Sequence, residues 1–88
     1  MYNLNKTNAQ KCITEGKNFK KQDNRRGFAI MVDLEDNTIW TDIFVSENEW
    51  NNYKKESIKN VSGFLNYIGA ELTAENILKY SKEEYFIV

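Results

Sequence analysis

The chain has 88 residues, with 12 Lys and Arg against 13 Asp and Glu, one cysteine, no histidine and no proline. This length fits a single domain, residues 1–88, with one modest hydrophobic core. Without histidine the chain can form no Ser-His-Asp triad, no Cys-His dyad and no imidazole metal site, so we expect neither an enzyme nor a bound cofactor.

The first predicted element is a helix from about residue 8 to residue 19. Thr7 and Gln10 have the spacing of a capping box at its start. A strand over residues 18–22 remains an alternative for the end of this segment. We expect Cys12 to be a buried structural thiol, because no histidine is present to activate it. The apolar stripe of the helix consists of Ala9, Cys12, Ile13, Gly16 and Phe19.

The clearest predicted element is a β-hairpin with strands at residues 28–34 and 39–45. A two-residue turn at residues 36–37 places Leu34 opposite Ile39 and collects the apolar side chains on one face. A slip of one residue would turn that face to solvent, so the pattern specifies which face is buried. The same register pairs Val32 with Thr41, Ile30 with Ile43 and Phe28 with Val45.

The segment after the hairpin is predicted to be helical. A capping box formed by Ser46 and Glu49 indicates a helix that begins near residue 47. The apolar periodicity allows one helix over residues 47–69. Gly63 favours two helices, because an interior glycine costs about 1 kcal/mol relative to alanine. The first would then end near residue 55 or 59 and the second at residue 69.

The last predicted elements are a helix and a strand. Thr73 can cap a helix that ends near Ser81. The β-prone residues 85–88 can add a third strand to the hairpin, which needs one because an isolated two-stranded sheet is only marginally stable. The predicted fold class is therefore a small α+β domain, an antiparallel hairpin (28–34/39–45) extended by a C-terminal strand and packed by three or four short helices.

Charge is distributed unevenly along the chain. Residues 1–26 carry a net charge of +5, residues 27–49 carry −6, and residues 50–88 are neutral overall. The basic and acidic blocks can fold against each other, since opposite charges attract within a Debye length of about 8–10 Å. Alternatively, they form two surfaces for different partners.

The hairpin face opposite the core combines large apolar side chains with carboxylates. Aromatic and methionine anchors ringed by acids are typical of protein interfaces, and the acids favour a partner with a basic surface. The alternative is that the N-terminal helix covers this face and its lysines meet the acids. The predicted protein-binding residues are Met31, Asp33, Glu35, Trp40, Asp42, Phe44, Glu47 and Glu49.

The same acids do not form a convincing metal or catalytic site. Residues 33–37 resemble the start of a calcium loop, but Thr38 stands where a glycine is needed and Phe44 where a bidentate glutamate should close the cage. Asp33 and Asp42 lie near enough for a carboxylate pair, but catalysis would require a desolvated cleft. We therefore expect residues 33–37 to form the hairpin turn and to bind no metal.

A basic cluster supports an alternative function in nucleic-acid binding. Lysines and arginines pair with phosphates, and the neighbouring Phe19 and Phe28 could stack on the bases of a single strand. Both phenylalanines are also expected in the core. The predicted nucleic-acid-binding residues are Lys17, Lys20, Lys21, Arg25 and Arg26, around a connector that turns at residues 23–24.

The leading prediction is a small non-enzymatic binding protein that acts as an inhibitor or accessory factor by occluding a basic surface of a protein partner. In size and in its acid-rich hairpin the chain resembles the small inhibitors and accessory proteins of phages and mobile elements, including anti-CRISPR proteins. That resemblance carries no motif. The chain shows no apolar run of a signal peptide, and its longest apolar run, residues 28–32, is far shorter than the ~18–20 residues that cross a bilayer. We therefore expect a cytoplasmic protein that does not enter a membrane.

Overall fold

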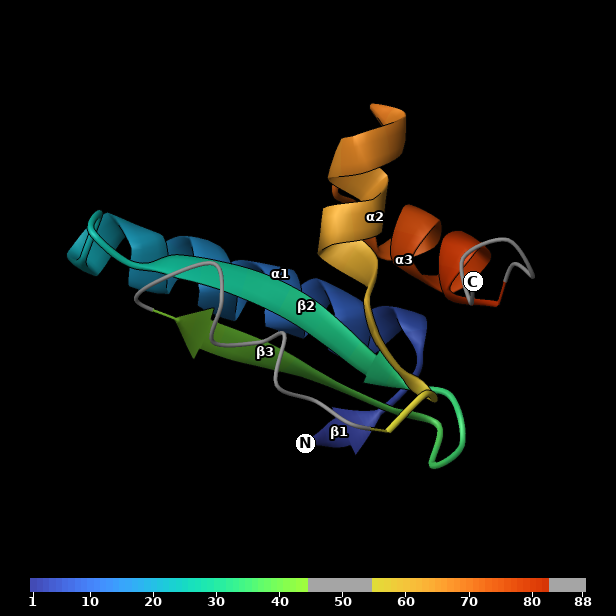
Figure 1. The fold of residues 1–88 in the computed structure, drawn as a ribbon. Helices are drawn as coiled ribbons and strands as arrows, with labels where there is room; N and C mark the ends of the chain where they lie inside the picture. Colours follow the sequence, from blue (N-terminus) through green and yellow to red (C-terminus); the bar gives the residue numbers. More distant parts are fainter. Residues whose placement is uncertain (45–54, 83–88) are drawn as a thin grey trace.

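The computed structural model describes residues 1–44 and 55–82. Four strands of the described residues form one antiparallel sheet in the order β1-β3-β2-β4. The helix α1 lies along one face of the β2–β3 hairpin (Figure 1), while α2 contacts β2, and α3 contacts both α1 and α2. The predicted α+β class is confirmed. In chain order the elements are β1 (Tyr2–Asn3), α1 (Lys6–Gln22), β2 (Gly27–Asp33), β3 (Thr38–Phe44), β4 (Ile58–Asn60), α2 (Val61–Ile68) and α3 (Ala74–Ser81).

Residues 6–22 form one continuous helix, so the strand alternative for residues 18–22 is wrong. The helix is longer than predicted, because it begins after Asn5, whose side chain accepts a hydrogen bond from the Asn8 N–H at 2.8 Å. Asn5 is therefore the N-cap in place of Thr7. The helix runs to Gln22. The positively charged Lys20 and Lys21 in its last turn interact favourably with the negative end of the helix dipole.

The hairpin forms with its predicted faces but with a different register. Asp33 pairs with Thr38 and Val32 with Ile39, two residues away from the predicted pairing. The loop therefore contains residues 34–37, and the two-residue turn is wrong; Asn37 takes a positive φ of 56° there, which asparagine tolerates. A shift of two residues returns every side chain to its original face, because side chains alternate along a strand. The predicted core face survives for this reason.

Two short strands extend the hairpin. Tyr2 of β1 pairs with Ile39, and Ile58 of β4 pairs with Asp33 on the other side. The predicted C-terminal strand at residues 85–88 lies outside the described residues. Neither of these two short strands was predicted from the sequence.

The predicted helix over residues 47–69 is wrong as a single helix, because Ile58–Asn60 is a strand. The capping box and the predicted helix start lie outside the described residues. A first helix reaching residue 59 is wrong for the same reason, whereas the second helix is confirmed as α2. It ends at Gly69, whose φ of 73° lies in the left-handed region that glycine occupies without strain.

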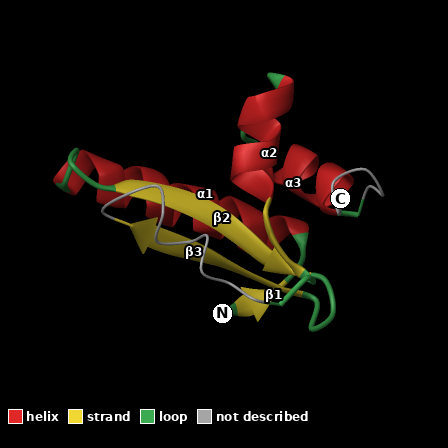
Figure 2. Cartoon of the chain, viewed as in Figure 1, coloured by secondary structure: helices red, strands yellow, loops and turns green. Residues whose placement is uncertain are grey.

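The last helix begins and ends where the sequence predicts. Thr73 accepts a hydrogen bond from the Asn76 N–H at 3.1 Å, and α3 ends at Ser81. Gly69 and Thr73 bound the short connector between α2 and α3, whereas α2 follows β4 directly (Figure 2).

The Thr73 cap gives a first testable prediction. Thr73→Ala should lower the free energy of unfolding by about 1 kcal/mol, because it leaves the first turn of α3 without its side-chain acceptor. Thr73→Ser keeps an acceptor oxygen and should cost much less. Urea unfolding of the three proteins measures this, and equal losses in both variants would contradict the capping role.

The hydrophobic core lies between α1 and the sheet. The Thr41 hydroxyl donates to the Cys12 carbonyl at 2.9 Å, so α1 packs on the predicted apolar face. The alternative in which this helix covers the acidic face is therefore wrong. Cys12 is fully buried, as predicted, and burial raises the pKa of its thiol. The buried cluster consists of Leu4, Ala9, Cys12, Ile13, Ile30, Val32, Ile39, Val61, Leu65, Ala74 and Ile77.

Candidate functional site

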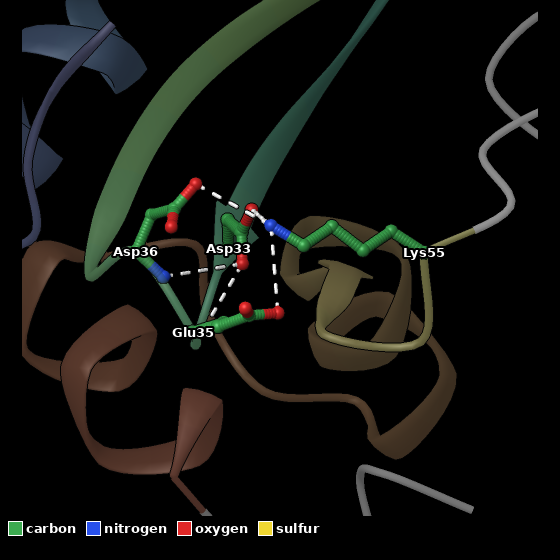
Figure 3. A network of polar contacts seen from close by, with 4 residues as sticks. All are labelled: Asp33, Glu35, Asp36 and Lys55. Atoms are coloured by element: carbon green, nitrogen blue, oxygen red, sulfur yellow. Dashed lines mark hydrogen bonds and ion pairs between the residues drawn. The ribbon is translucent and has the colours of Figure 1, made fainter.

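A network of charged side chains occupies the loop end of the hairpin. The Lys55 ammonium lies 2.9 Å from Asp33 Oδ2, 3.4 Å from Asp36 Oδ2 and 3.5 Å from Glu35 Oε2. Figure 3 shows the three carboxylates converging on this one nitrogen. We call these four residues the acidic loop end; three carboxylates against one ammonium leave it a formal charge of −2.

Asp33 is the structural centre of the acidic loop end. Its side chain is 6% exposed, and its Oδ1 accepts hydrogen bonds from the backbone N–H groups of Glu35 at 3.0 Å and Asp36 at 3.4 Å. One carboxylate therefore shapes the loop through Oδ1 and binds Lys55 through Oδ2. This side-chain bonding to the backbone two residues onward is the reason the loop takes four residues instead of two.

The pairing holds both partners in their charged forms. The hydrogen bond from Lys55 lowers the pKa of Asp33 from its usual 3.8 to about 2, against the opposing effect of burial. The same bond raises the pKa of Lys55 above its usual 10.5, against desolvation. Neither group can exchange a proton near neutral pH, so this ion pair stabilises the loop and takes no part in proton transfer.

The structure changes which predicted residues can meet a partner. Met31 is 2% exposed and Asp33 is 5% exposed, so these two cannot serve as contact residues in this conformation. Trp40 and Asp42 are half-buried, and each makes further contacts. Glu35 is exposed as predicted.

The side chain of Phe44 and the whole of Glu47 and Glu49 lie outside the described residues.

Two residues of the acidic loop end were missed from the sequence. Asp36 was assigned to the turn alone, but its side chain is 61% exposed beside that of Glu35 at 68%. Its turn position was itself a signal, because loop residues present their side chains to solvent. Lys55 gave no signal, since it is 22 residues from Asp33 and contacts it only in the folded chain.

The predicted basic residues gather where α1 ends and β2 begins. All five are exposed, and we call Lys17, Lys20, Lys21, Arg25 and Arg26 the basic end. The Lys20 ammonium donates to the carbonyls of Asn24 at 2.8 Å and Arg26 at 3.0 Å. Lys20 therefore fastens the turn that carries both arginines.

One acid lies among these five cations. Asp23 meets Arg25 Nε at 3.3 Å and Arg26 Nε at 3.6 Å, so a single carboxylate is shared between two guanidinium groups. Arg25 is 87% exposed and Arg26 is 47% exposed. The basic end keeps a formal charge of +4.

The two phenylalanines near the basic end serve packing. Phe28 is half-buried and its ring lies directly beneath Gly16 of α1. Phe19 is half-buried on the same helix. Because these rings pack within the fold, they are poorly placed for the predicted stacking on nucleic-acid bases.

The acidic loop end and the basic end lie at opposite ends of β2 (Figure 1). A seven-residue strand spans about 20 Å, roughly twice the Debye length at physiological salt. The loop acids pair with Lys55 and not with the N-terminal lysines. For these residues, the alternative in which the basic and acidic blocks neutralise each other is wrong.

Within residues 1–44 and 55–82, no group of three or more Cys, Asp or Glu residues is arranged to hold a metal ion. Among the helices of these ranges, none is long and apolar enough to cross a membrane. No family model matches the sequence, and comparison with curated proteins and solved structures found no match.

Proposed function

We propose that the protein acts by binding a protein partner with a basic surface, and that the acidic loop end is the centre of this contact. The observation that carries the proposal is the display of Glu35 and Asp36, whose side chains are 68% and 61% exposed on a loop that Asp33 holds in shape. A preorganised loop loses less conformational entropy on binding than a flexible one.

The proposed mechanism is occlusion of the partner. The carboxylates of Glu35 and Asp36 pair with lysines or arginines that otherwise hold phosphates, and their net charge speeds encounter. Trp40 lies on the same face of the sheet as Asp33 and supplies a half-buried aromatic side chain at the margin of the contact. Phe44, Glu47 and Glu49 remain predicted members of this surface.

The proposal includes no catalytic step. Asp33, the most buried carboxylate of residues 1–44 and 55–82, is held ionised by Lys55, so it has no proton to donate near neutral pH and is a poor base. We therefore propose an inhibitor or accessory factor that works in the cytoplasm through contact alone.

A pair of neutralised variants tests the proposal. Glu35→Gln with Asp36→Asn removes two exposed charges while the Asp33–Lys55 pair stays in place. Tagged wild-type and variant proteins are incubated with nuclease-treated lysate of the source cells, and captured proteins are quantified by mass spectrometry. We expect the variant to capture at least about tenfold less of one partner protein than the wild type does. This corresponds to a loss of roughly 1.4 kcal/mol in binding free energy.

The matched control is Glu71→Gln with Glu75→Gln, which removes the same charge from exposed positions near α3. The control should retain capture. Retained capture by the Glu35 and Asp36 variant, or an equal loss in the control, would disprove the assignment of the surface.

A further inference from the structure

We propose that the basic end is a second binding surface that holds a nucleic-acid duplex through its phosphates, without reading its sequence. This surface lies at the other end of β2 from the acidic loop end, so the inference is independent of the function proposed above. It rests on the placement of five exposed cations at one end of the molecule.

The first step is the excess of positive charge. Five cations with one shared carboxylate leave +4 within ten consecutive residues, 17–26, although the whole chain has a net charge of −1. A duplex carries one negative charge per ~1.7 Å of its axis, so it is the complement with the highest charge density among common cellular polymers. Charge complementarity therefore favours a nucleic-acid duplex as the partner of the basic end.

The second step is preorganisation of the turn. The Asp23 N–H donates to the Phe19 carbonyl at 2.9 Å and ends the helix, and the Lys20 ammonium binds two carbonyls of the turn that follows. Asp23 Oδ1 also accepts from the Arg25 N–H at 3.1 Å. The two arginines are therefore held on a fixed backbone, and a guanidinium can donate two parallel hydrogen bonds to one phosphate.

The third step assigns separate roles to the lysines. Lys20 is occupied in holding the turn, so it is a positioning residue. Lys17 and Lys21 are four residues apart and lie on one helix face, one turn from each other. With Arg25 and Arg26 of the turn that follows the helix, they give four exposed cations that can contact phosphates.

The fourth step separates a duplex from a single strand. Single strands are held largely by stacking of bases on aromatic side chains. Phe28 packs beneath α1 and Phe19 is half-buried, so the basic end offers charge without a stacking surface. The basic end therefore favours a duplex, which has more phosphates per unit length than a single strand.

The test is a titration of the full chain with fluorescently labelled duplex DNA of ~20 base pairs and with one of its strands, at NaCl concentrations from about 20 to 200 mM. Fluorescence anisotropy reports binding. With four phosphate contacts, log K should fall with log salt at a slope of about −3.6, and the duplex should bind more tightly than the strand.

The variant Lys17→Gln with Lys21→Gln removes two of the four contacts and should reduce the slope to about −1.8. The matched control is Lys6→Gln with Lys11→Gln, which removes the same charge from the other end of α1 and should keep the wild-type slope. Circular dichroism melting of each variant shows whether the fold is retained.

Several outcomes would overturn the inference. These are no binding at the lowest salt, tighter binding of the single strand, or an equal change of slope in the control variant. Binding to vesicles rich in phosphatidylglycerol without binding to the duplex would assign the surface to a lipid headgroup. Self-association that disappears with salt, again without duplex binding, would assign it to the acidic loop end of a second copy.

Discussion

Gly16→Ala is expected to lower the free energy of unfolding by about 1–3 kcal/mol, although alanine is the better helix former by about 1 kcal/mol. A Cβ atom at this position would lie 2.6 Å from Cε2 and 2.8 Å from Cγ of Phe28, with Cδ2 in contact as well. Real Cβ atoms do not approach ring carbons this closely, so α1 or the ring must move. The clash outweighs the gain in helix propensity because the ring is packed between α1 and the sheet.

Urea unfolding of Gly16→Ala measures this effect, and two further variants assign its cause. Asn18→Ala on the exposed side of the same helix should be neutral or slightly stabilising. In a double-mutant cycle, Phe28→Leu should remove much of the cost of the added methyl group, since it removes the ring that the methyl meets. A stabilising Gly16→Ala would show that α1 does not lie this close to β2.

Lys55→Met is expected to raise the pKa of Asp33 from about 2 by about 1–2 units and to lower the melting temperature at neutral pH. Methionine keeps the length of the side chain but removes the charge that Asp33 faces. Asp33 then stays 6% exposed with its two backbone hydrogen bonds and no cation. A buried charge without its partner is destabilising.

The pH dependence of stability follows from the directions of the two pKa shifts. Asp33 has a lowered pKa in the folded chain, so its contribution is complete above its usual 3.8 and is lost as the pH falls through about 2. Lys55 has a raised pKa, so its contribution is complete below its usual 10.5 and is lost as the pH rises above that value. Lys55→Met should flatten the acid limb and remove the part of the alkaline limb that Lys55 contributes.

Thermal melts across this pH range and carbon-13 NMR of the Asp33 carboxyl group check both expectations. Glu35→Gln is the control, since Glu35 is 68% exposed and lies 3.5 Å from the same ammonium. Exposed ion pairs contribute little, so this variant should melt close to the wild type. An unchanged pKa of Asp33 in Lys55→Met would contradict the role of Lys55.

The elements that the sequence predicted well are those whose signal is local. The Thr73 cap stands beside the helix that it begins, and Gly69 stands at the end of α2. The buried face of the hairpin follows from the alternation of apolar and polar residues, which does not depend on the exact pairing. The buried face was therefore predicted correctly, although the predicted register differs from the observed one by two residues.

The elements that were missed depend on contacts between distant residues. β4 forms because the outer edge of β2 needs partners: the Leu34 N–H donates to the Ser57 carbonyl at 3.0 Å and the Ile30 N–H to the Ser62 hydroxyl at 2.9 Å. The apolar residues at 58 and 61 suggested helical spacing instead. Sheet pairing overrode that local pattern, as tertiary context does for short segments.

The candidate surfaces divide in the same way. The basic end was predicted residue by residue, because its cations lie within ten residues of one helix end and turn. The acidic surface was predicted from its composition, but Met31 and Asp33 are buried and do not belong to it.

The sequence alone determined the α+β class, the core face of the hairpin, the N-cap of the last helix and the clustering of basic charge, because each follows from residues near one another in the chain. Only the tertiary structure decided the hairpin register, the strand at Ile58–Asn60 and the ion pair of Asp33 with Lys55. Those features depend on which distant groups remain to satisfy a hydrogen bond or a charge once the core has formed, and no local pattern encodes that choice.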